Sequence, residues 1–343
     1  MKKAIATILI LLLLSTMFVS VSATNISNDQ IAEPITSYDI EYYEYPITAD
    51  SPNWFDYTVL EKVEMLTIPE NILNRMTDEA LIQAIADYPY LVDIYLYGDS
   101  VNDGIATSQS YFSALNELLS RDTAVESLST YGVSFANAVS TAAATDAEID
   151  NHDKLAAMSM DYILDYARNA LVSDSSIASP MGSTTGYIYT PGGLSVPAVF
   201  YDSCRATRDH SIIDEEAIEK YNVIKVRSGS CYYNCHSYAW YSRSSSNRAW
   251  IPNAGIYTTD STYTQVYSGN LLAPLYSSGV MSGDIVFYGN GAHSAVFIGN
   301  AASGNSLGAG LCESKWGLAG VFQHELGDVP PEYCASTVYI YRD

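Results

Sequence analysis

Positively charged residues are scarce in this chain of 343 residues. Lys and Arg together number 16 against 39 Asp and Glu, so the formal net charge is −23 at pH 7. Proteins that bind nucleic acid neutralise phosphates with clusters of Lys and Arg. The composition therefore argues against a nucleic-acid partner, and equally against electrostatic attachment to an anionic cell wall.

Cysteine is also scarce, and its spacing does not indicate a metal site. All of the five cysteines lie in the C-terminal half: Cys204, Cys231, Cys235, Cys312 and Cys334. Cys231 and Cys235 are close in sequence, but no second cysteine or histidine pair accompanies them, as a zinc site would require. We expect no metal and no organic cofactor. If Cys235 is a free nucleophile, the other four cysteines allow three disulfide pairings.

Long apolar runs are absent except at the N-terminus. Met1-Lys2-Lys3 is basic, residues 4–18 are almost all apolar, and Val21-Ser22-Ala23 has the small residues of a cleavage site. This pattern predicts a secretory signal peptide over residues 1–23, because a membrane span needs about 20 apolar residues. We expect a secreted protein that begins at Thr24 and has no membrane association after cleavage.

The rest of the composition is that of a globular protein. Hydrophobic residues make up 48% and charged residues 16%, enough apolar material for a large core. The 29 tyrosines could contact carbohydrate or peptide, but packing on a pleated sheet is the favoured interpretation for most of them.

Changes in pattern divide the mature chain into four segments. Residues 24–55 are polar and acidic and are interpreted as a loose leader. Residues 56–172 have helical periodicity, residues 173–200 form a linker and a β-hairpin, and residues 201–343 consist of short strands with one clear helix from about Cys235 to Ser242. The predicted fold class is α+β.

Two helix starts are predicted in the helical segment. Thr77 can cap a helix whose first turn carries Asp78 and Glu79, and Thr123 with Glu126 fits a capping box. Two apolar stripes are interpreted as core faces: Tyr111, Phe112, Leu115, Leu118 and Leu119, then Leu155, Met158, Tyr162 and Tyr166. This segment contains no constellation of catalytic type.

The most informative stretch surrounds Cys235. Tyr232-Tyr233-Asn234-Cys235-His236-Ser237-Tyr238-Ala239-Trp240 predicts a cysteine at the start of a buried helix. Free backbone N–H groups at such a helix start stabilise a thiolate and can also bind an oxyanion. A disulfide is the alternative for this cysteine.

A histidine follows at a suitable place. Gly283-Asp284 predicts a turn into an apolar strand, and a second turn at 289–291 places His293 at the exposed start of the next strand. A thiol nucleophile needs a base, and the base needs a third group to orient it. Glu313, on the following strand, is the candidate for that third group, and His324, one strand later, is its competitor.

The order Asn234-Cys235-His236, then Gly283-Asp284-Ile285-Val286-Phe287-Tyr288, then His293-Ser294-Ala295-Val296 resembles the NlpC/P60 and CHAP group of papain-like amidases and endopeptidases. The resemblance covers roughly residues 200–343. It implies a papain-like domain in which a cysteine-bearing helix packs on an antiparallel sheet. Cys235 would be the nucleophile, His293 the base and Glu313 the third polar residue.

The chain departs from this family beside the nucleophile. Many members have Asp before the cysteine and Gly or Ser-Gly after it, whereas this chain has Asn234 and His236-Ser237. The helical half, together with the Ser-Lys-Trp-Gly segment at 314–317, is similar to secreted Firmicute proteins. No role is assigned to His236.

The resulting expectation is a secreted cysteine amidase or endopeptidase whose partner is a cell-wall peptide, cleaved through an acyl-enzyme. One alternative is a secreted interaction protein with an inactive or repurposed hydrolase-like domain. Another is a transglutaminase or acyltransferase that uses the same thiol.

Overall fold

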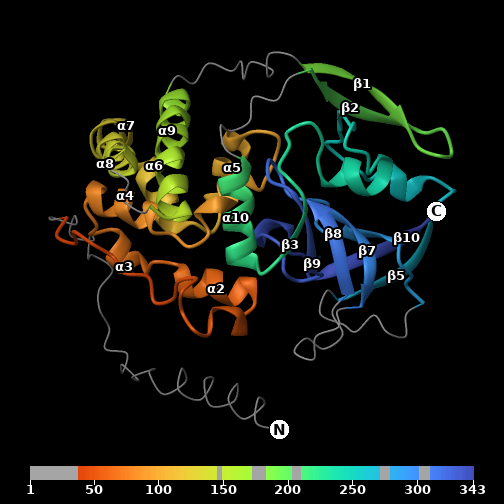
Figure 1. Cartoon of the computed structure of the whole chain (residues 1–343), viewed down its shortest axis with the longest axis horizontal. Helices are drawn as coiled ribbons and strands as arrows, with labels where there is room; N and C mark the ends of the chain where they lie inside the picture. Colours follow the sequence, from red (N-terminus) through yellow and green to blue (C-terminus); the bar gives the residue numbers. More distant parts are fainter. Residues whose placement is uncertain (1–37, 145–148, 172–182, 203–209, 271–278, 301–309) are drawn as a thin grey trace, which may run out of the picture. The chain divides into compact units, whose positions relative to one another are not determined.

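The computed structural model describes residues 38–144, 149–171, 183–202, 210–270, 279–300 and 310–343. It is a mixed α+β structure with helices in the N-terminal half and antiparallel sheets later, which confirms the predicted class at that level (Figure 1). The predicted signal peptide and residues 24–37 lie outside the described residues. Among the residues that are described, no helix is both long enough and apolar enough to span a membrane.

The N-terminal half is built from short helices and one long helix. The α-helices are α2 (Val59–Leu66), α3 (Glu70–Leu73), α4 (Asp78–Ala86), α5 (Val101–Ser108), α6 (Ser113–Ser120), α7 (Ala124–Ser127), α8 (Val133–Ala144) and α9 (Asn151–Leu171). Two short 3₁₀ helices, η1 (Trp54–Asp56) and η2 (Leu91–Tyr95), and one π-helical turn, η3 (Leu128–Gly132), complete the described part of this half. Both predicted stripes supply the core between these helices, although Tyr111 and Phe112 precede α6 rather than belonging to it.

One of the two predicted helix caps is present. The Thr77 side chain accepts from the amide of Ala80 at 3.1 Å and begins α4. The capping box at Thr123 is wrong, because α7 has no side-chain cap. The Thr123 hydroxyl instead donates to Asp78 at 2.5 Å. The Thr123 hydroxyl, which the local sequence predicts as a helix cap, is therefore bound to a carboxylate of helix α4.

The predicted loose leader is wrong for its described part. Tyr45 is buried and donates its hydroxyl to the carbonyl of Ala84 at 3.0 Å. Trp54 is buried too, and its indole N–H donates to the carbonyl of Lys220 at 3.0 Å. Two aromatic side chains therefore fix this segment to the core. The acidic residues around them gave the segment the composition of a loose leader.

The described residues of the C-terminal half form two antiparallel sheets. The small sheet has the order β1 (Ser183–Tyr189), β2 (Ser195–Tyr201), β4 (Ala249–Trp250). The large sheet has seven strands in the order β3 (Ile224–Arg227), β9 (Val321–Glu325), β8 (Gly310–Lys315), β7 (Ser294–Asn300), β6 (Ile285–Tyr288), β10 (Thr337–Arg342), β5 (Thr264–Asn270). The predicted hairpin is confirmed as β1 and β2, and Gly193 supplies its positive φ of 88°. Residues 173–182 of the predicted linker lie outside the described residues.

Helix α10 (His210–Tyr221) is missing from the sequence prediction, which placed strands there. It lies beside α9 and next to the β3 edge of the large sheet (Figure 1). Asp214, Glu216 and Lys220 are buried in it. Lys220 and His152 reach the Glu216 carboxylate at 3.6 and 3.1 Å. Charged residues on the buried side hid the apolar periodicity that normally identifies a helix.

The two faces of the large sheet carry separate hydrophobic clusters. Val286, Ala295 and Cys312 belong to the cluster shared with the helical half, whereas Ile285 and Val296 belong to the other cluster. Because successive side chains of a strand point to opposite faces, position within a strand decides which cluster a side chain can reach. This alternation governs the composition of the site described below.

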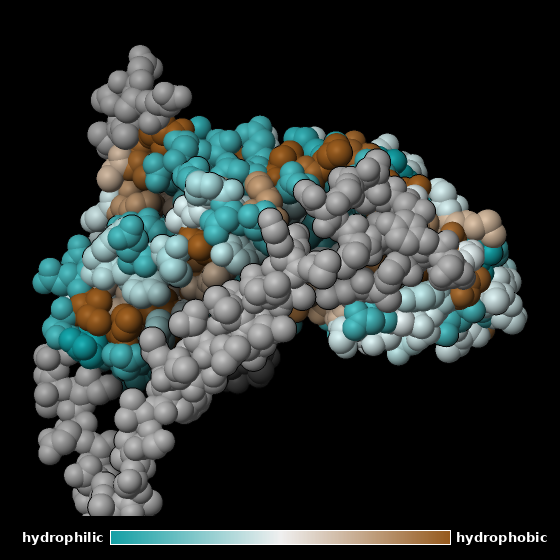
Figure 2. Space-filling view, turned by 90° about the horizontal axis from the view of Figure 1, so that it is seen from below, coloured by the Kyte–Doolittle hydropathy of each residue, from teal (hydrophilic) through white to brown (hydrophobic). Residues whose placement is uncertain are grey.

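The helical half and the large sheet share one core. The amide of Leu318 donates to the carbonyl of Tyr95 at 2.9 Å. Gly317 has φ +36°, and a Cβ there would lie 2.3 Å from the backbone carbon of Leu96. Residues Tyr38–Asp343 accordingly form one compact unit. On the face shown in Figure 2, hydrophobic groups are scattered among hydrophilic ones over the described residues.

Candidate active site

Cys235 is the first residue of a short helix, as predicted, and the helix continues as η4 (Ser237–Tyr241). Asn234 caps this helix by accepting from the amide of Ser237 at 3.0 Å. The amide group of Asn234 also donates to the carbonyl of Ile251 at 2.7 Å, and its oxygen accepts from the Ile251 amide at 3.2 Å. An aspartate could not donate to that carbonyl, which gives Asn a physical reason to stand before the cysteine.

Cys235 carries a free thiol, so the disulfide alternative is excluded for it. Cys312 and Cys334 are free as well, whereas Cys231 is disulfide-bonded. Cys204 lies outside the described residues.

The Cys235 sulfur lies against the backbone on both sides of His293. It is 4.0 Å from the carbonyl oxygen of Ala292, and the backbone amides of Ser294, His236 and Cys235 itself favour its thiolate form. Burial outweighs these amides and raises the pKa of the Cys235 thiol to about 11. In the resting protein this group is therefore a neutral thiol, not the thiolate that its place at a helix start suggested.

Among the described residues, Lys315 is the cation whose charge acts on the pKa of the Cys235 thiol. It is fully buried at the end of β8, where Nζ donates to the carbonyl of Gly317 and lies 5.6 Å from the ring centre of Tyr233. Burial lowers the pKa of Lys315 to about 7, while the negative charges of Asp214 and of the Cys235 thiolate act to raise it. Its positive charge in turn lowers the pKa of Cys235.

Replacing Lys315 by methionine is expected to slow alkylation of Cys235 at neutral pH by about three- to tenfold. The substitution keeps the length of the side chain but removes a charge that favours the thiolate. The rate of carbamidomethylation of Cys235, followed by peptide mass spectrometry, measures the effect. Lys225→Met is the matched control, because Lys225 contacts Asp214 at 3.6 Å from the more exposed strand β3. Equal rates in the two variants would contradict the role given to Lys315.

His293 immediately precedes β7, as predicted, but it is fully buried, so the prediction of an exposed position is wrong. Its ring stacks on Tyr333 with centroids 4.1 Å apart and planes 13° from parallel. Burial lowers the pKa of His293 well below its usual value, and the neighbouring His324 and His236 add to the effect. The imidazole is therefore neutral at pH 7.

Hydrogen-bond directions fix which nitrogen of His293 carries the proton. His324 Nδ1 is 2.7 Å from the carbonyl of Glu325, which can only accept, so the neutral His324 ring has its lone pair on Nε2. The Ser314 hydroxyl, 2.7 Å from that Nε2, must donate to it. Ser314 Oγ accepts from the indole N–H of Trp316 at 2.9 Å and is left to accept from His293 Nε2 at 3.0 Å.

His293 therefore has its proton on Nε2 and its lone pair on Nδ1. Nδ1 is buried and has no hydrogen-bond partner among the described residues. The basic nitrogen is thus free to accept a proton, on a ring whose other nitrogen is held. In this structure the Cys235 thiol is directed to the Ala292 carbonyl and is not hydrogen-bonded to Nδ1.

Glu313, the predicted third group, is not brought to His293. Its carboxylate accepts from the Tyr238 hydroxyl and lies 3.4 Å from the amide nitrogen of Gln323. Ser314, the next residue of β8, points to the opposite face and meets the imidazole. The competitor His324 enters the network through Ser314. The geometry therefore supports Ser314 and His324 as orienting residues in place of Glu313.

His236, which had no predicted role, is a buried support for the site. Its Nδ1 lies 2.8 Å from the Ser294 hydroxyl, which also accepts from the indole N–H of Trp240 at 2.9 Å. Burial lowers the pKa of His236 to about 4, against a hydrogen bond to the backbone of Gly291. A neutral His236 thereby fastens the cysteine-bearing helix to the segment around His293.

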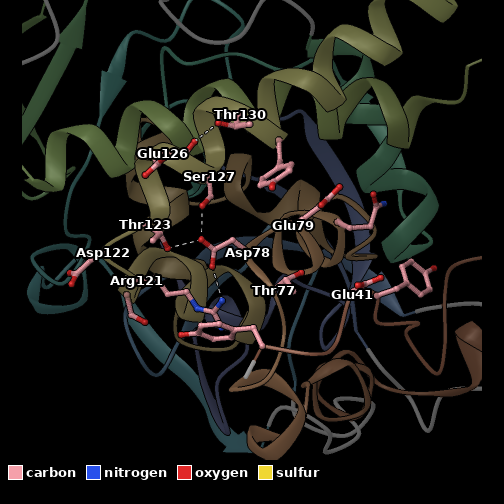
Figure 3. A pocket seen from close by; sticks show the side chains of 15 residues that line it. Glu41, Thr77, Asp78, Glu79, Arg121, Asp122, Thr123, Glu126, Ser127 and Thr130 are labelled. Carbon is pink, nitrogen blue, oxygen red and sulfur yellow. Dashed lines mark hydrogen bonds and ion pairs between the residues drawn. The ribbon is translucent and has the colours of Figure 1, made fainter. Parts of the chain in front are cut away.

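A separate groove of about 1280 Å³ lies in the helical half. Its walls include carboxylates and tyrosines: Glu41, Asp78, Glu79, Asp122, Glu126, Tyr38, Tyr42 and Tyr131. Figure 3 shows Asp78 among Arg121, Thr123 and Ser127, and Arg121 is neutralised by Asp78 at 2.7 Å and Glu117 at 2.9 Å. The groove is acidic and contains none of the predicted catalytic residues.

Four residues of the site have no role in the sequence analysis: Ser314, Lys315, Trp316 and Tyr333. The segment Ser314-Lys315-Trp316-Gly317 carries one local signal, because a Ser two residues before a Trp is compatible with the hydroxyl–indole bond observed here. Nothing in the sequence around Tyr333 indicates its contact with His293.

Among the described residues, no group of three or more His, Cys, Asp or Glu side chains is arranged to hold a metal ion. Comparisons with models of known protein families, with curated proteins and with solved structures find no match for this chain.

Proposed function

We propose that this protein is a secreted cysteine hydrolase of amide bonds, with Cys235 as nucleophile and His293 as base. The observation that carries the proposal is the state of His293: Nε2 is held by Ser314, and Nδ1 is an unpaired buried acceptor. The Cys235 sulfur lies against the backbone of the two residues that flank this histidine. A nucleophile, a base and an orienting group in that order constitute the machinery of acyl transfer.

In the proposed reaction, His293 Nδ1 takes the thiol proton as the Cys235 sulfur attacks the carbonyl carbon of the substrate. Backbone amides beside the sulfur, among them those of Cys235 and His236, are placed to favour developing negative charge. The C–N bond breaks as Nδ1 returns the proton to the leaving amine. Water, deprotonated by the same Nδ1, then cleaves the thioester and regenerates the thiol.

The finer parts of the proposal rest on the sequence. The likeness to NlpC/P60 and CHAP domains suggests a papain-like domain, and together with the predicted signal peptide it suggests peptide amides of peptidoglycan as substrate. The helix that carries Cys235 and the antiparallel sheet that carries His293 and Ser314 are compatible with such a domain.

Purified sacculi treated with the mature protein are expected to release new muropeptides, and Cys235→Ala is expected to release none above the background without enzyme. Mass spectrometry of the soluble fragments identifies the bond that is cut. Cys334→Ala is the matched control, because it removes another free thiol that is partly buried. A Cys235→Ala protein as active as the wild type would refute the proposal.

A second candidate, a secreted interaction protein, is favoured by one observation. Both Cys235 and His293 are buried, and their side chains are not hydrogen-bonded to each other. The sacculus assay separates the two candidates: a hydrolase releases muropeptides that Cys235→Ala does not release, whereas an interaction protein releases none. Addition of a primary amine to a reactive enzyme would reveal a transglutaminase or acyltransferase through the amide product.

A further inference from the structure

We propose that Asp93, a buried carboxylate of the helical half, is a positioning residue for His293 and acts through two separate chains of side chains. The inference rests on the proposed function and deepens it, because it gives the helical half a part in the site. Asp93 lies in η2, is 1% exposed, and accepts one phenol hydrogen bond on each of its oxygens.

The first chain runs from Asp93 to the protonated nitrogen of His293. Tyr221 donates to Asp93 Oδ1 at 2.5 Å, and its ring meets Trp316 edge-on with centroids 5.2 Å apart. Trp316 donates to Ser314 Oγ at 2.9 Å, and this oxygen accepts from His293 Nε2 at 3.0 Å. The position of the Trp316 indole therefore decides where the acceptor for His293 lies.

The second chain runs from Asp93 to the face of the His293 ring. Tyr111 donates to Asp93 Oδ2 at 2.7 Å, and its hydroxyl is 2.9 Å from that of Tyr97. Tyr97 packs edge-on against Tyr333 with centroids 5.1 Å apart, and Tyr333 stacks on His293 at 4.1 Å. The two chains thus reach one imidazole at its edge and at its face.

The backbone of the same turn supports both chains. Tyr333 donates its hydroxyl to the carbonyl of Leu96 at 2.5 Å, and Leu318 donates to the carbonyl of Tyr95 at 2.9 Å. Both carbonyls lie within three residues of Asp93. A carboxylate that fixes two phenols and the turn around it can hold the imidazole within the narrow limits that proton transfer requires.

The test uses the full mature chain and three variants: Asp93→Asn, Tyr221→Phe and Tyr111→Phe. The nitrogen chemical shifts of His293 report its tautomer directly and need no substrate. We expect a single Nε2–H tautomer in the wild type and a mixture of tautomers or exchange broadening in each variant. On a cleaved substrate, kcat should fall about ten- to hundredfold with little change in KM.

Tyr90→Phe is the matched control. The Tyr90 ring stacks on Tyr221 with centroids 4.9 Å apart, but its buried hydroxyl has no hydrogen-bond partner among the described residues. It should give the His293 spectrum of the wild type. Tyr221→Phe should also cause less change when Asp93 is already Asn, since an amide has a single acceptor oxygen and cannot accept from both phenols.

A folded Asp93→Asn protein with wild-type His293 shifts and wild-type kcat would overturn the inference, as would a Tyr221→Phe effect that adds fully to that of Asp93→Asn. Because the shifts are measured without substrate, failure of the proposed function is distinguishable. A wild type that hydrolyses nothing but whose His293 shifts respond as expected refutes the hydrolase and supports the positioning role.

Discussion

Replacing His293 by glutamine is expected to lower amide hydrolysis by about 10³-fold, the contribution typical of a general base together with loss of thiol activation. Glutamine can still donate to Ser314 Oγ, which His293 contacts at 3.0 Å, but it supplies no lone pair basic enough to take the thiol proton. The expected loss is in kcat, measured on the amide bond that the sacculus assay identifies as a substrate. Substrate binding should change little.

His152→Gln is the control for the general effect of losing a histidine. His152 belongs to α9 and contacts Glu216 at 3.1 Å, in the helical half. The His152→Gln protein should hydrolyse the same amide bond at close to the wild-type rate. If His293→Gln retained more than about a tenth of wild-type kcat, the base would have to be another group, and the role argued from the free Nδ1 would be wrong.

Asp93→Asn is expected to make the protein more stable relative to the wild type as the pH rises. Burial raises the pKa of Asp93 to about 7, against the lowering effect of hydrogen bonds from Tyr221 and Tyr111. Because the folded protein holds this proton to a higher pH than the unfolded chain does, the unfolding free energy of the wild type falls between about pH 4 and pH 7. An asparagine does not ionise, so the variant lacks this decline.

The expected gain of the variant over the wild type, between about pH 4 and pH 8, is about 4 kcal/mol, from a pKa near 7 in place of about 3.9. Urea unfolding at several pH values measures it, and other titrating groups cancel in the difference. Asp161→Asn, on the exposed side of α9, controls for the loss of one negative charge from an acidic chain. A difference between Asp93→Asn and wild type that is constant with pH would contradict the prediction.

The Asp93 carboxylate is also proposed to position His293, so its replacement should affect catalysis as well as stability. The negative charge of Asp93 raises the pKa of the phenols around it. They are Tyr88, Tyr90, Tyr97, Tyr111, Tyr221 and Tyr333. Burying a charge without a partner of opposite sign costs free energy, and an amide of similar shape avoids that cost. A variant that is more stable yet catalytically poorer would show that the charge is retained for the site and at the expense of stability.

The parts of the fold that local sequence determines were predictable. Turn glycines identified the β1–β2 hairpin, a threonine followed by acidic residues identified the start of α4, and the order of apolar strands placed His293 beside β7. Cys235 was recognised as the start of a helix for the same reason. Each of these signals depends on residues within a few positions of one another.

The parts that depend on register were not predictable. The β7–β8 pairing shifts between Phe297 and Gly299, and no residue pattern announces such an irregularity. Without the register, residue type favours Glu313 over Ser314. A carboxylate commonly orients a histidine, whereas a serine in a strand carries no signal of that role. Similarly, α10 was missed because its buried charges have partners from distant segments.

The meeting of Gly317 and Leu318 with the turn at Tyr95 and Leu96 also bears on modularity. The segment around Gly317 and Leu318 is built partly on the backbone of the helical half, with Gly317 too close to Leu96 for any side chain. The C-terminal half made alone would expose that surface and lose the acceptor of the Tyr333 hydroxyl. The C-terminal half is therefore not expected to keep this part of its structure when it is separated from the helical half.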